Sequence, residues 1–94
     1  MTVMSTQRTA LVTGGNRGIG LAICKDLAER GLHVVLGSRD EANGEAAARP
    51  IRAQGGTVRV EQIDVAEPDS ITDCYERLAA DDVAVDVLVN NAGI

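Results

Sequence analysis

The 94-residue sequence has almost no aromatic residues: Tyr75 is the single tyrosine, and tryptophan and phenylalanine are absent. Its 45% hydrophobic share therefore consists almost entirely of aliphatic side chains, which suit parallel strands covered by helices. Cysteine is also scarce. Cys24 and Cys74 fall on separate predicted helices and lack metal-site spacing, so we expect two reduced packing residues and no metal. His33, the only histidine, is expected to be structural rather than a ligand or a base.

Positive charge is limited, with nine Lys and Arg against fourteen Asp and Glu and a net charge of −5. This balance argues against a nucleic-acid partner, which would require a basic patch. No run of 18 apolar residues occurs, and Met1 to Arg8 lacks the apolar segment of a signal peptide. We therefore expect no membrane partner and a cytoplasmic location, with residues 1–8 forming a flexible N-terminus.

The most distinctive stretch runs from Thr13 to Gly20 and reads TGGNRGIG. It follows an apolar run and opens a helical pattern, so it is predicted to join a strand to a helix. Glycine lets a ligand approach the backbone, and the first N–H groups of the helix then face an anion. The spacing of Gly14, Gly18 and Gly20 matches neither G-x-G-x-x-G nor a P-loop, and Lys25, the only lysine, lies too far along the helix for a P-loop. Such turns are also glycine-rich for steric reasons alone, which leaves a purely structural interpretation open.

The rest of the chain alternates apolar strands with helical segments. In the second helix, Gly44 and Pro50 predict a kink or an interruption. In the first, Ile19, Ala22, Ile23 and Leu27 predict the face that packs on the sheet. The β-α-β-α-β-α-β order predicts an α/β fold with a Rossmann-type, doubly wound parallel sheet. The expected strands are 9–12, 33–36, 57–63 (an edge strand) and 85–89, and the expected helices are 18–29, 40–54 and 68–80.

Distinctive residues follow the predicted end of every strand. The glycine turn follows the first strand, Ser38 and Arg39 follow the second, Asp64 follows the third, and Asn90 to Gly93 follow the fourth. The carboxyl ends of parallel strands share one edge of a sheet, where α/β proteins bind ligands. The sequence therefore predicts a ligand site along this edge.

These same residues resemble the N-terminal half of a short-chain dehydrogenase/reductase, and in particular the NADPH-dependent carbonyl reductases. The glycine turn matches the family's T-G-x-x-x-G-x-G cofactor motif, Asp64 matches its adenine-side acid, and residues 90–93 match its N-N-A-G motif. The resemblance extends from Thr9 to Ile94. It implies a small carbonyl or alcohol substrate and, for a full-length protein, a homo-oligomer.

The resemblance also implies a role for each matching residue. Residues of the glycine turn would lie under the pyrophosphate, with Asp64 and the Val65 backbone beside the adenine. Asn90, Ala92 and Gly93 would line the ribose and the approach to the nicotinamide, whereas Asn91 would tie neighbouring strands of the sheet. The full set of expected cofactor-binding residues is Gly14, Asn16, Arg17, Gly18, Ile19, Gly20, Ser38, Arg39, Asp64, Val65, Asn90, Ala92 and Gly93.

The choice of cofactor depends on the end of the second strand. Enzymes specific for NAD usually carry an acid there, which binds the 2′-hydroxyl and repels a 2′-phosphate. Here the position holds Ser38, followed by Arg39, whose guanidinium suits a phosphate. Arg17 is placed to reach the same phosphate, and the pair favours NADP(H) over NAD(H). Two alternatives stay open: both arginines are merely solvated, and Asp40 either pairs with Arg39 or caps the next helix.

Catalytic residues are missing from the sequence. The family resemblance calls for a Ser and a Tyr-x-x-x-Lys pair after the N-N-A-G strand, but Tyr75 precedes that strand and has Ala79 in the lysine position. Tyr75 is therefore expected to be a helix packing residue. We expect residues 9–94 to be a partial NADP(H)-binding domain, truncated after the fourth strand and inactive alone, of an oxidoreductase that interconverts a carbonyl compound and an alcohol. A non-catalytic NADP(H) sensor and a non-functional fragment are the alternatives.

Overall fold

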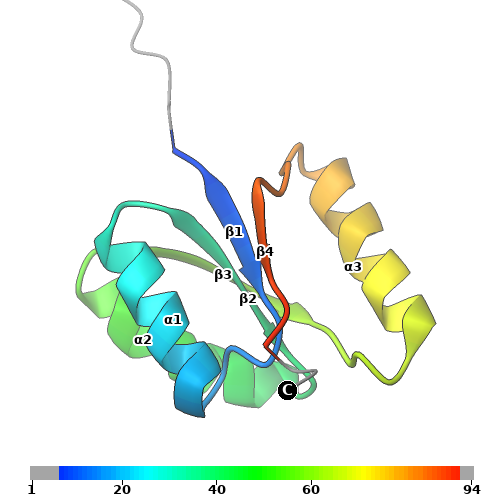
Figure 1. Ribbon diagram of the computed structural model, residues 1–94, viewed down its shortest axis with the longest axis horizontal. Coiled ribbons are helices and arrows are strands. Elements are labelled where there is room, and N and C mark those ends of the chain that lie inside the picture. Colours follow the sequence, from blue (N-terminus) through cyan, green and yellow to red (C-terminus); the bar gives the residue numbers. More distant parts are fainter. Residues whose placement is uncertain (1–6, 92–94) are drawn as a thin grey trace, which may run out of the picture.

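The computed structural model describes residues 7–91, which form a parallel sheet flanked by helices. The strand order is β3-β2-β1-β4, and every neighbouring pair is parallel. Helices α1 and α2 cover one face of the sheet and α3 covers the other (Figure 1). The predicted Rossmann-type α/β fold is confirmed. The elements are β1 (Thr9–Val12), α1 (Gly18–Glu29), β2 (His33–Ser38), α2 (Glu41–Ala53), β3 (Thr57–Gln62), α3 (Pro68–Ala80) and β4 (Val87–Val89).

The sheet has a separate apolar core on each face, because successive side chains of a strand point to opposite sides. Cys24 lies in the core under α1 and α2 and Cys74 in the core under α3, and both are free and buried as predicted. Tyr75 lies on α3 but is 40% exposed, so the prediction that it packs is wrong. The α1/α2 core comprises Val12, Cys24, Val34, Leu36, Ala48, Ile51, Val58 and Val60, and the α3 core comprises Leu11, Val35, Ile63, Cys74 and Leu78.

Helix α2 runs without interruption from Glu41 to Ala53, which corrects the predicted break. Gly44 is needed for close packing, since a Cβ atom there would lie 2.7 Å from Cγ1 of Val60 on β3. Pro50 lies in the last turns on an exposed side, where only one helical hydrogen bond is lost. Packing against the sheet therefore outweighs the low helix propensity of both residues.

The buried face of α1 matches the prediction in part, because Ile23 and Leu27 pack against the core as expected. Ile19 is 71% exposed and Ala22 is exposed, whereas Gly20 and Cys24 are the buried residues of this helix. Gly20 is buried because the start of the helix approaches the glycine turn too closely for a side chain. The exposed Ile19 is thereby left at the carboxyl edge of the sheet.

Strand β4 begins at Val87 rather than Val85, because Asp86 ends the ladder with β1. The backbone N–H of Asp86 donates to the Thr9 carbonyl, and the Asp86 carboxylate accepts from the Thr9 N–H, both at 2.8 Å. Val85 instead packs against the α3 core. The side chain of Asp86 thus replaces a strand partner at the start of β1.

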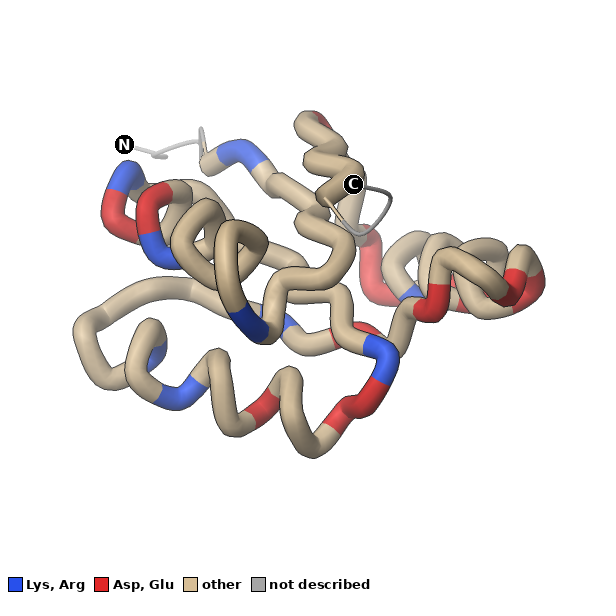
Figure 2. The backbone as a smooth tube through the Cα atoms, turned by 60° about the horizontal axis from the view of Figure 1, so that its bottom comes forward, with Lys and Arg blue, Asp and Glu red and all other residues tan. Residues whose placement is uncertain are grey.

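Helix α3, which carries several acidic residues (Figure 2), is joined to β3 by a charged cluster. The Glu61 side chain is 7% exposed, and its two carboxylate oxygens accept from Nε of Arg59 at 2.8 Å and Nε of Arg77 at 2.7 Å. Arg59 also pairs with Asp81 at 2.7 Å. The bonds to Glu61 raise the pKa of both arginines. Among the described helices, none is long and apolar enough to cross a membrane.

Candidate cofactor-binding site

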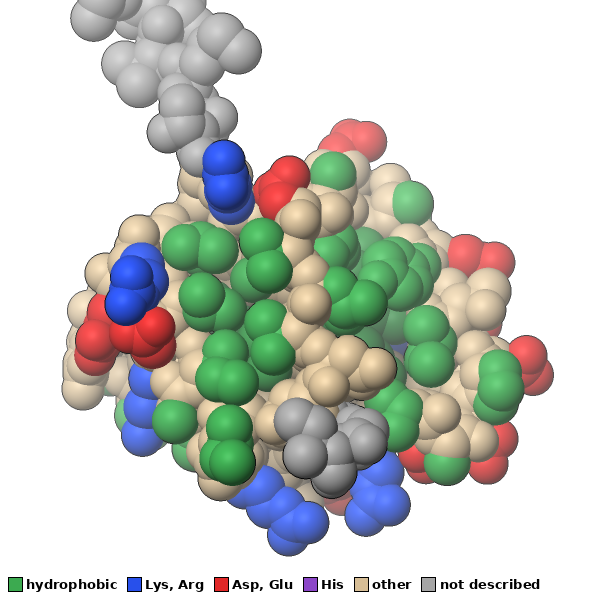
Figure 3. Space-filling view, viewed as in Figure 1, with side chains coloured by type: hydrophobic (Ala, Val, Ile, Leu, Met, Phe, Trp, Pro, Cys, Tyr) green, Lys and Arg blue, Asp and Glu red, His purple; other side chains and the backbone are tan. Residues whose placement is uncertain are grey.

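The residues expected at the ligand site lie at one edge of the sheet, where all four strands have their carboxyl ends. The glycine turn follows β1, Ser38 is the last residue of β2, and Asp64 and Asn90 follow β3 and β4. Figure 3 shows Lys and Arg side chains at this edge, at the bottom of the view. Ala92 and Gly93 lie outside the described residues.

The glycine turn has a backbone that other residues would strain. Gly14 and Gly18 have φ angles of 62° and 57°, in the left-handed region that favours glycine. A Cβ atom at Gly20 would lie 2.1 Å from the Gly14 carbonyl oxygen. Beneath the turn, Sγ of Cys24 would be 2.9 Å from a Cβ atom at Gly15. Burial raises the pKa of the Cys24 thiol to about 12, so this residue is a neutral packing group.

The N-terminus of α1 is open toward the edge of the sheet. Its N-cap residue, Arg17, provides no side-chain cap, and the first turn contains no acidic residue. By contrast, α2 has Asp40 as its N-cap and Glu41 in its first turn. The first N–H groups of α1 therefore have no side-chain partner among the described residues, which is the arrangement that binds an anion.

Asn90 and Asn91 connect the end of β4 to the glycine turn. The Asn91 side-chain amide donates to the Gly14 carbonyl at 3.2 Å, and the Thr13 hydroxyl donates to Oδ1 of Asn90 at 3.2 Å. Asn91 therefore links adjacent strands, as the sequence predicted. Asn90 is exposed beside the turn, and Asn16 within the turn is half-buried.

Asp64 is held by a residue that the sequence analysis did not identify. Its N–H donates to the Ser70 hydroxyl at 2.8 Å, and its Oδ1 accepts from the Ala66 N–H at 3.0 Å. Oδ2 has no partner within the described part of the chain, and Val65 beside it is 39% exposed. The sequence does contain a signal for Ser70, because it is a hydroxyl residue in the first turn of α3, six positions after Asp64.

The end of β2 contains both charged groups and a buried hydroxyl. Ser38 is 1% exposed, and its hydroxyl donates to the Asp40 carbonyl at 2.6 Å. The Asp40 carboxylate accepts from the Asn43 N–H at 3.0 Å, so Asp40 caps α2 and does not pair with Arg39. Arg17 and Arg39 are exposed, and neither side chain has a hydrogen-bond or ion-pair partner among residues 7–91.

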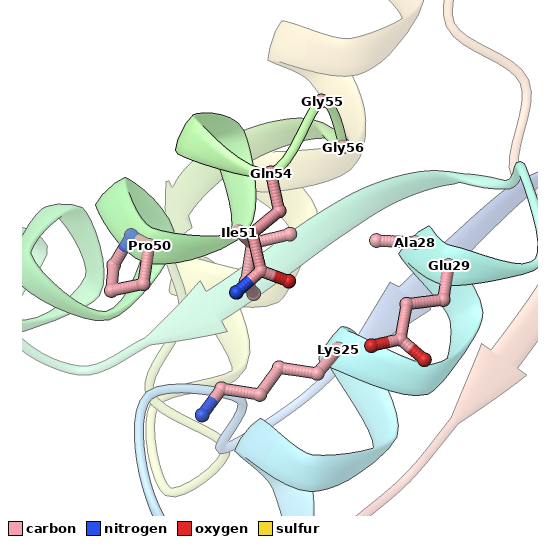
Figure 4. A pocket seen from close by; sticks show the side chains of 8 residues that line it. All are labelled: Lys25, Ala28, Glu29, Pro50, Ile51, Gln54, Gly55 and Gly56. Atoms are coloured by element: carbon pink, nitrogen blue, oxygen red, sulfur yellow. The ribbon is translucent and has the colours of Figure 1, made fainter.

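A pocket of about 440 Å³ lies elsewhere, between α1 and α2 (Figure 4). It lies toward the C-terminal ends of both helices and so away from the glycine turn. Lys25, Glu29 and Gln54 supply its polar groups, and Ile51 and Pro50 supply apolar surface. Among the described residues, no group of three or more His, Cys, Asp or Glu is placed to hold a metal ion.

Comparisons with known proteins agree with this geometry. The family model for short chain dehydrogenase matches residues 8–94. Carbonyl reductase (NADPH) 3 from Mus musculus is 46% identical over 91 residues, which cover 96% of this chain and 33% of that protein. Among solved structures, menthone neomenthol reductase from Mentha piperita is 41% identical with a TM-score of 0.87, covering 96% of this chain and 33% of that one. A gluconate 5-dehydrogenase from Burkholderia cenocepacia, in complex with NADP and tartrate, is 40% identical with a TM-score of 0.85. The match covers 93% of this chain and 34% of that one.

The parallel sheet and the helices on both of its faces define a Rossmann-type α/β protein. The chain belongs to the short chain dehydrogenase family. It spans about a third of the length of the curated relatives that it matches.

Proposed function

We propose that this chain is the cofactor-binding part of an NADP(H)-dependent oxidoreductase that interconverts a carbonyl compound and an alcohol. The observation that carries the proposal is the open N-terminus of α1, with the unpartnered guanidinium groups of Arg17 and Arg39 at the same edge of the described sheet. A neutral substrate would not require such a concentration of donors and positive charge. Two similar proteins support the same cofactor, since one is named as an NADPH carbonyl reductase and the other was solved in complex with NADP.

The residues of the glycine turn fit a pyrophosphate. The positive φ angles of Gly14 and Gly18 turn the chain from β1 into α1, and the absence of a side chain at Gly20 lets the helix begin close to the Gly14 carbonyl. The first N–H groups of α1 can then donate to an anion. Asn16 and the exposed Ile19 would flank this contact. We assign adenine recognition to the free carboxylate oxygen of Asp64 and to Val65, and the ribose side to Asn90 with Ala92 and Gly93.

Arg39 and Arg17 would bind the 2′-phosphate. A guanidinium can donate two charge-assisted hydrogen bonds to a phosphate, whereas a 2′-hydroxyl offers no charge in return. Ser38 would support this site without contacting the phosphate, because its hydroxyl is buried and bonded to the backbone of Asp40. When bound, the dinucleotide would supply or accept the hydride, and we assign the proton transfer to residues of a full-length protein.

Calorimetric titration with NADPH and NADH tests the proposal. We expect the wild-type chain to bind NADPH more tightly. Arg39→Ala should weaken NADPH binding by about 10- to 100-fold, the loss expected for one or two charge-assisted bonds, and leave NADH binding nearly unchanged. Arg49→Ala is the matched control, because it removes the same charge from an exposed residue near the far end of α2. Equal binding of both cofactors by the wild-type chain, or equal loss of both in Arg39→Ala, would contradict the proposal.

A further inference from the structure

Asp40 occupies a position that ought to oppose an NADP(H) site. It immediately follows Arg39, and both residues are exposed. A carboxylate close to this arginine would neutralise it, and a carboxylate close to the 2′-phosphate would repel it. A chain that binds a 2′-phosphate here must therefore keep the Asp40 carboxylate away from the site.

Hydrogen bonds fix Asp40 in another role. Its Oδ1 accepts from the Asn43 N–H at 3.0 Å. Its carbonyl oxygen accepts from the Gly44 N–H at 3.0 Å and from the Ser38 hydroxyl at 2.6 Å. A carboxylate is favoured at this place because it lies at the positive end of the α2 dipole. Asp40 is thus oriented by its side chain and by its backbone at once.

Ser38 and Gly44 form the surface on which the first turn of α2 rests. A Cβ atom at Gly44 would lie 3.0 Å from Cβ of Ser38, so the helix approaches the end of β2 as closely as two small residues allow. Ser38 is 1% exposed and its hydroxyl is already engaged with Asp40. This hydroxyl is therefore placed to hold the helix N-terminus rather than to contact a ligand directly.

From this geometry we infer that Ser38 is a positioning residue for cofactor specificity. It anchors Asp40 as the N-cap of α2 and so leaves Arg39 free for the 2′-phosphate. The inference rests on the proposed NADP(H) function. It adds an explanation of how an NADP(H) site can have an acidic residue, Asp40, next to Arg39. Without the anchor, the Asp40 carboxylate would turn toward Arg39 and lower the preference for NADPH.

A double-mutant cycle on Ser38 and Asp40 tests this, with NADPH and NADH affinities measured by calorimetry and folding monitored by circular dichroism. Ser38→Ala should reduce the NADPH/NADH affinity ratio by about tenfold, the effect of a single misplaced charge. Asp40→Asn should leave the ratio within about twofold, because Asn is an equally good N-cap. The double variant should recover the wild-type ratio, since the freed side chain then carries no charge.

Three outcomes would overturn the inference. Ser38→Ala could weaken both cofactors equally, which is the result of a purely structural role. Its loss of NADPH preference could persist in the double variant, which would mean that Ser38 touches the phosphate itself. Asp40→Asn alone could raise NADPH affinity tenfold, which would mean that the wild-type carboxylate already opposes the phosphate.

Asp40→Glu provides a second variant if Ser38→Ala does not fold. It keeps the charge but makes a poorer cap, since short side chains are preferred at that position. The NADPH/NADH ratio should fall, and an unchanged ratio would refute the role of the cap. Failure of the proposed function is a separate result: a wild-type chain without NADPH preference contradicts the function, whereas preference retained in the wild type and in Ser38→Ala contradicts only the role of Ser38.

Discussion

Replacing Glu61 by alanine should destabilise the chain more than removal of any surface ion pair. Glu61 is 7% exposed on its side chain and accepts from both Arg59 and Arg77. Its loss leaves two guanidinium groups facing each other at the junction of β3 and α3. Arg59 would still have Asp81, but Arg77 would retain only its bond to the Gln62 carbonyl.

The size of the effect follows from the exposure of the partners. Breaking a fully buried pair costs about 3–5 kcal/mol. The Arg59 and Arg77 side chains are 25% and 45% exposed, so water will solvate the freed charges in part, and we expect about 2 kcal/mol. In a domain of this size, that corresponds to a fall in Tm of about 10 °C.

Urea unfolding followed by far-ultraviolet circular dichroism measures this change, because the chain has no tryptophan for fluorescence. Glu45→Ala is the matched control: its pair with Arg52 has side chains 43% and 38% exposed and should contribute about 0.5 kcal/mol. If Glu61→Ala destabilises the chain no more than Glu45→Ala does, the reasoning is refuted. The Glu61→Ala/Arg77→Ala double variant should cost less than the sum of the single variants, since each loses the same contact.

Three further predictions concern Cys24 beneath the glycine turn, Gly20 within the turn and Asp86 before β4. The free energy of unfolding should fall as pH rises from 9.0 toward about 12, because the Cys24 thiol ionises at lower pH in the unfolded chain. The fall should reach up to about 4 kcal/mol. It should be smaller in Cys24→Ala when the wild-type chain and the variant are each unfolded with urea across this pH range. Gly20→Ala places a Cβ atom 2.1 Å from the Gly14 carbonyl oxygen, so calorimetry should show loss of NADPH binding together with a lower Tm. Asp86→Ala removes the acceptor of the Thr9 N–H and should cost about 1–2 kcal/mol in urea unfolding.

Each of these predictions has a contradicting result. The same pH dependence in the wild type and in Cys24→Ala would show that the thiol does not ionise differently on unfolding. Full NADPH binding by Gly20→Ala would mean that the turn can open without losing its function. For Asp86, Asp86→Asn serves as the control, because an amide oxygen can still accept from Thr9, and equal stability losses in the alanine and asparagine variants would count against the proposed bond.

Features with local signals were predicted well from the sequence. The bounds of α1 were predicted because glycines begin it and Gly31, at φ 88°, follows its end. Pro68 was expected to be the first residue of a helix, and it is the first residue of α3. The placement of the glycine turn, Asp64 and Asn90 at one edge also needed only the order of parallel strands.

Features that depend on contacts between distant segments were not predicted. Strand β2 continues through Gly37 and Ser38 because β3 offers Glu61 and Gln62 as partners. The sequence around β2 alone gives no sign of this pairing, since the partners lie 24 positions away. The anchoring of Asp40 by Ser38 and of Asp64 by Ser70 likewise depends on how each helix meets the sheet. The exposure of Ile19 follows from the close approach at Gly20, which no periodicity reveals.

The central position of β1 has a consequence for folding during synthesis. One neighbour of this strand, β2, is made soon after it, but the other, β4, is made only after α2, β3 and α3. Asn91 and Gly14, which share a hydrogen bond, are separated by 77 positions. A ribosome therefore releases the glycine turn long before Asn91 is made to support it, and one side of β1 stays open until β4 emerges. Chaperones that shield exposed strand edges would have their longest opportunity to act between the synthesis of β1 and that of β4.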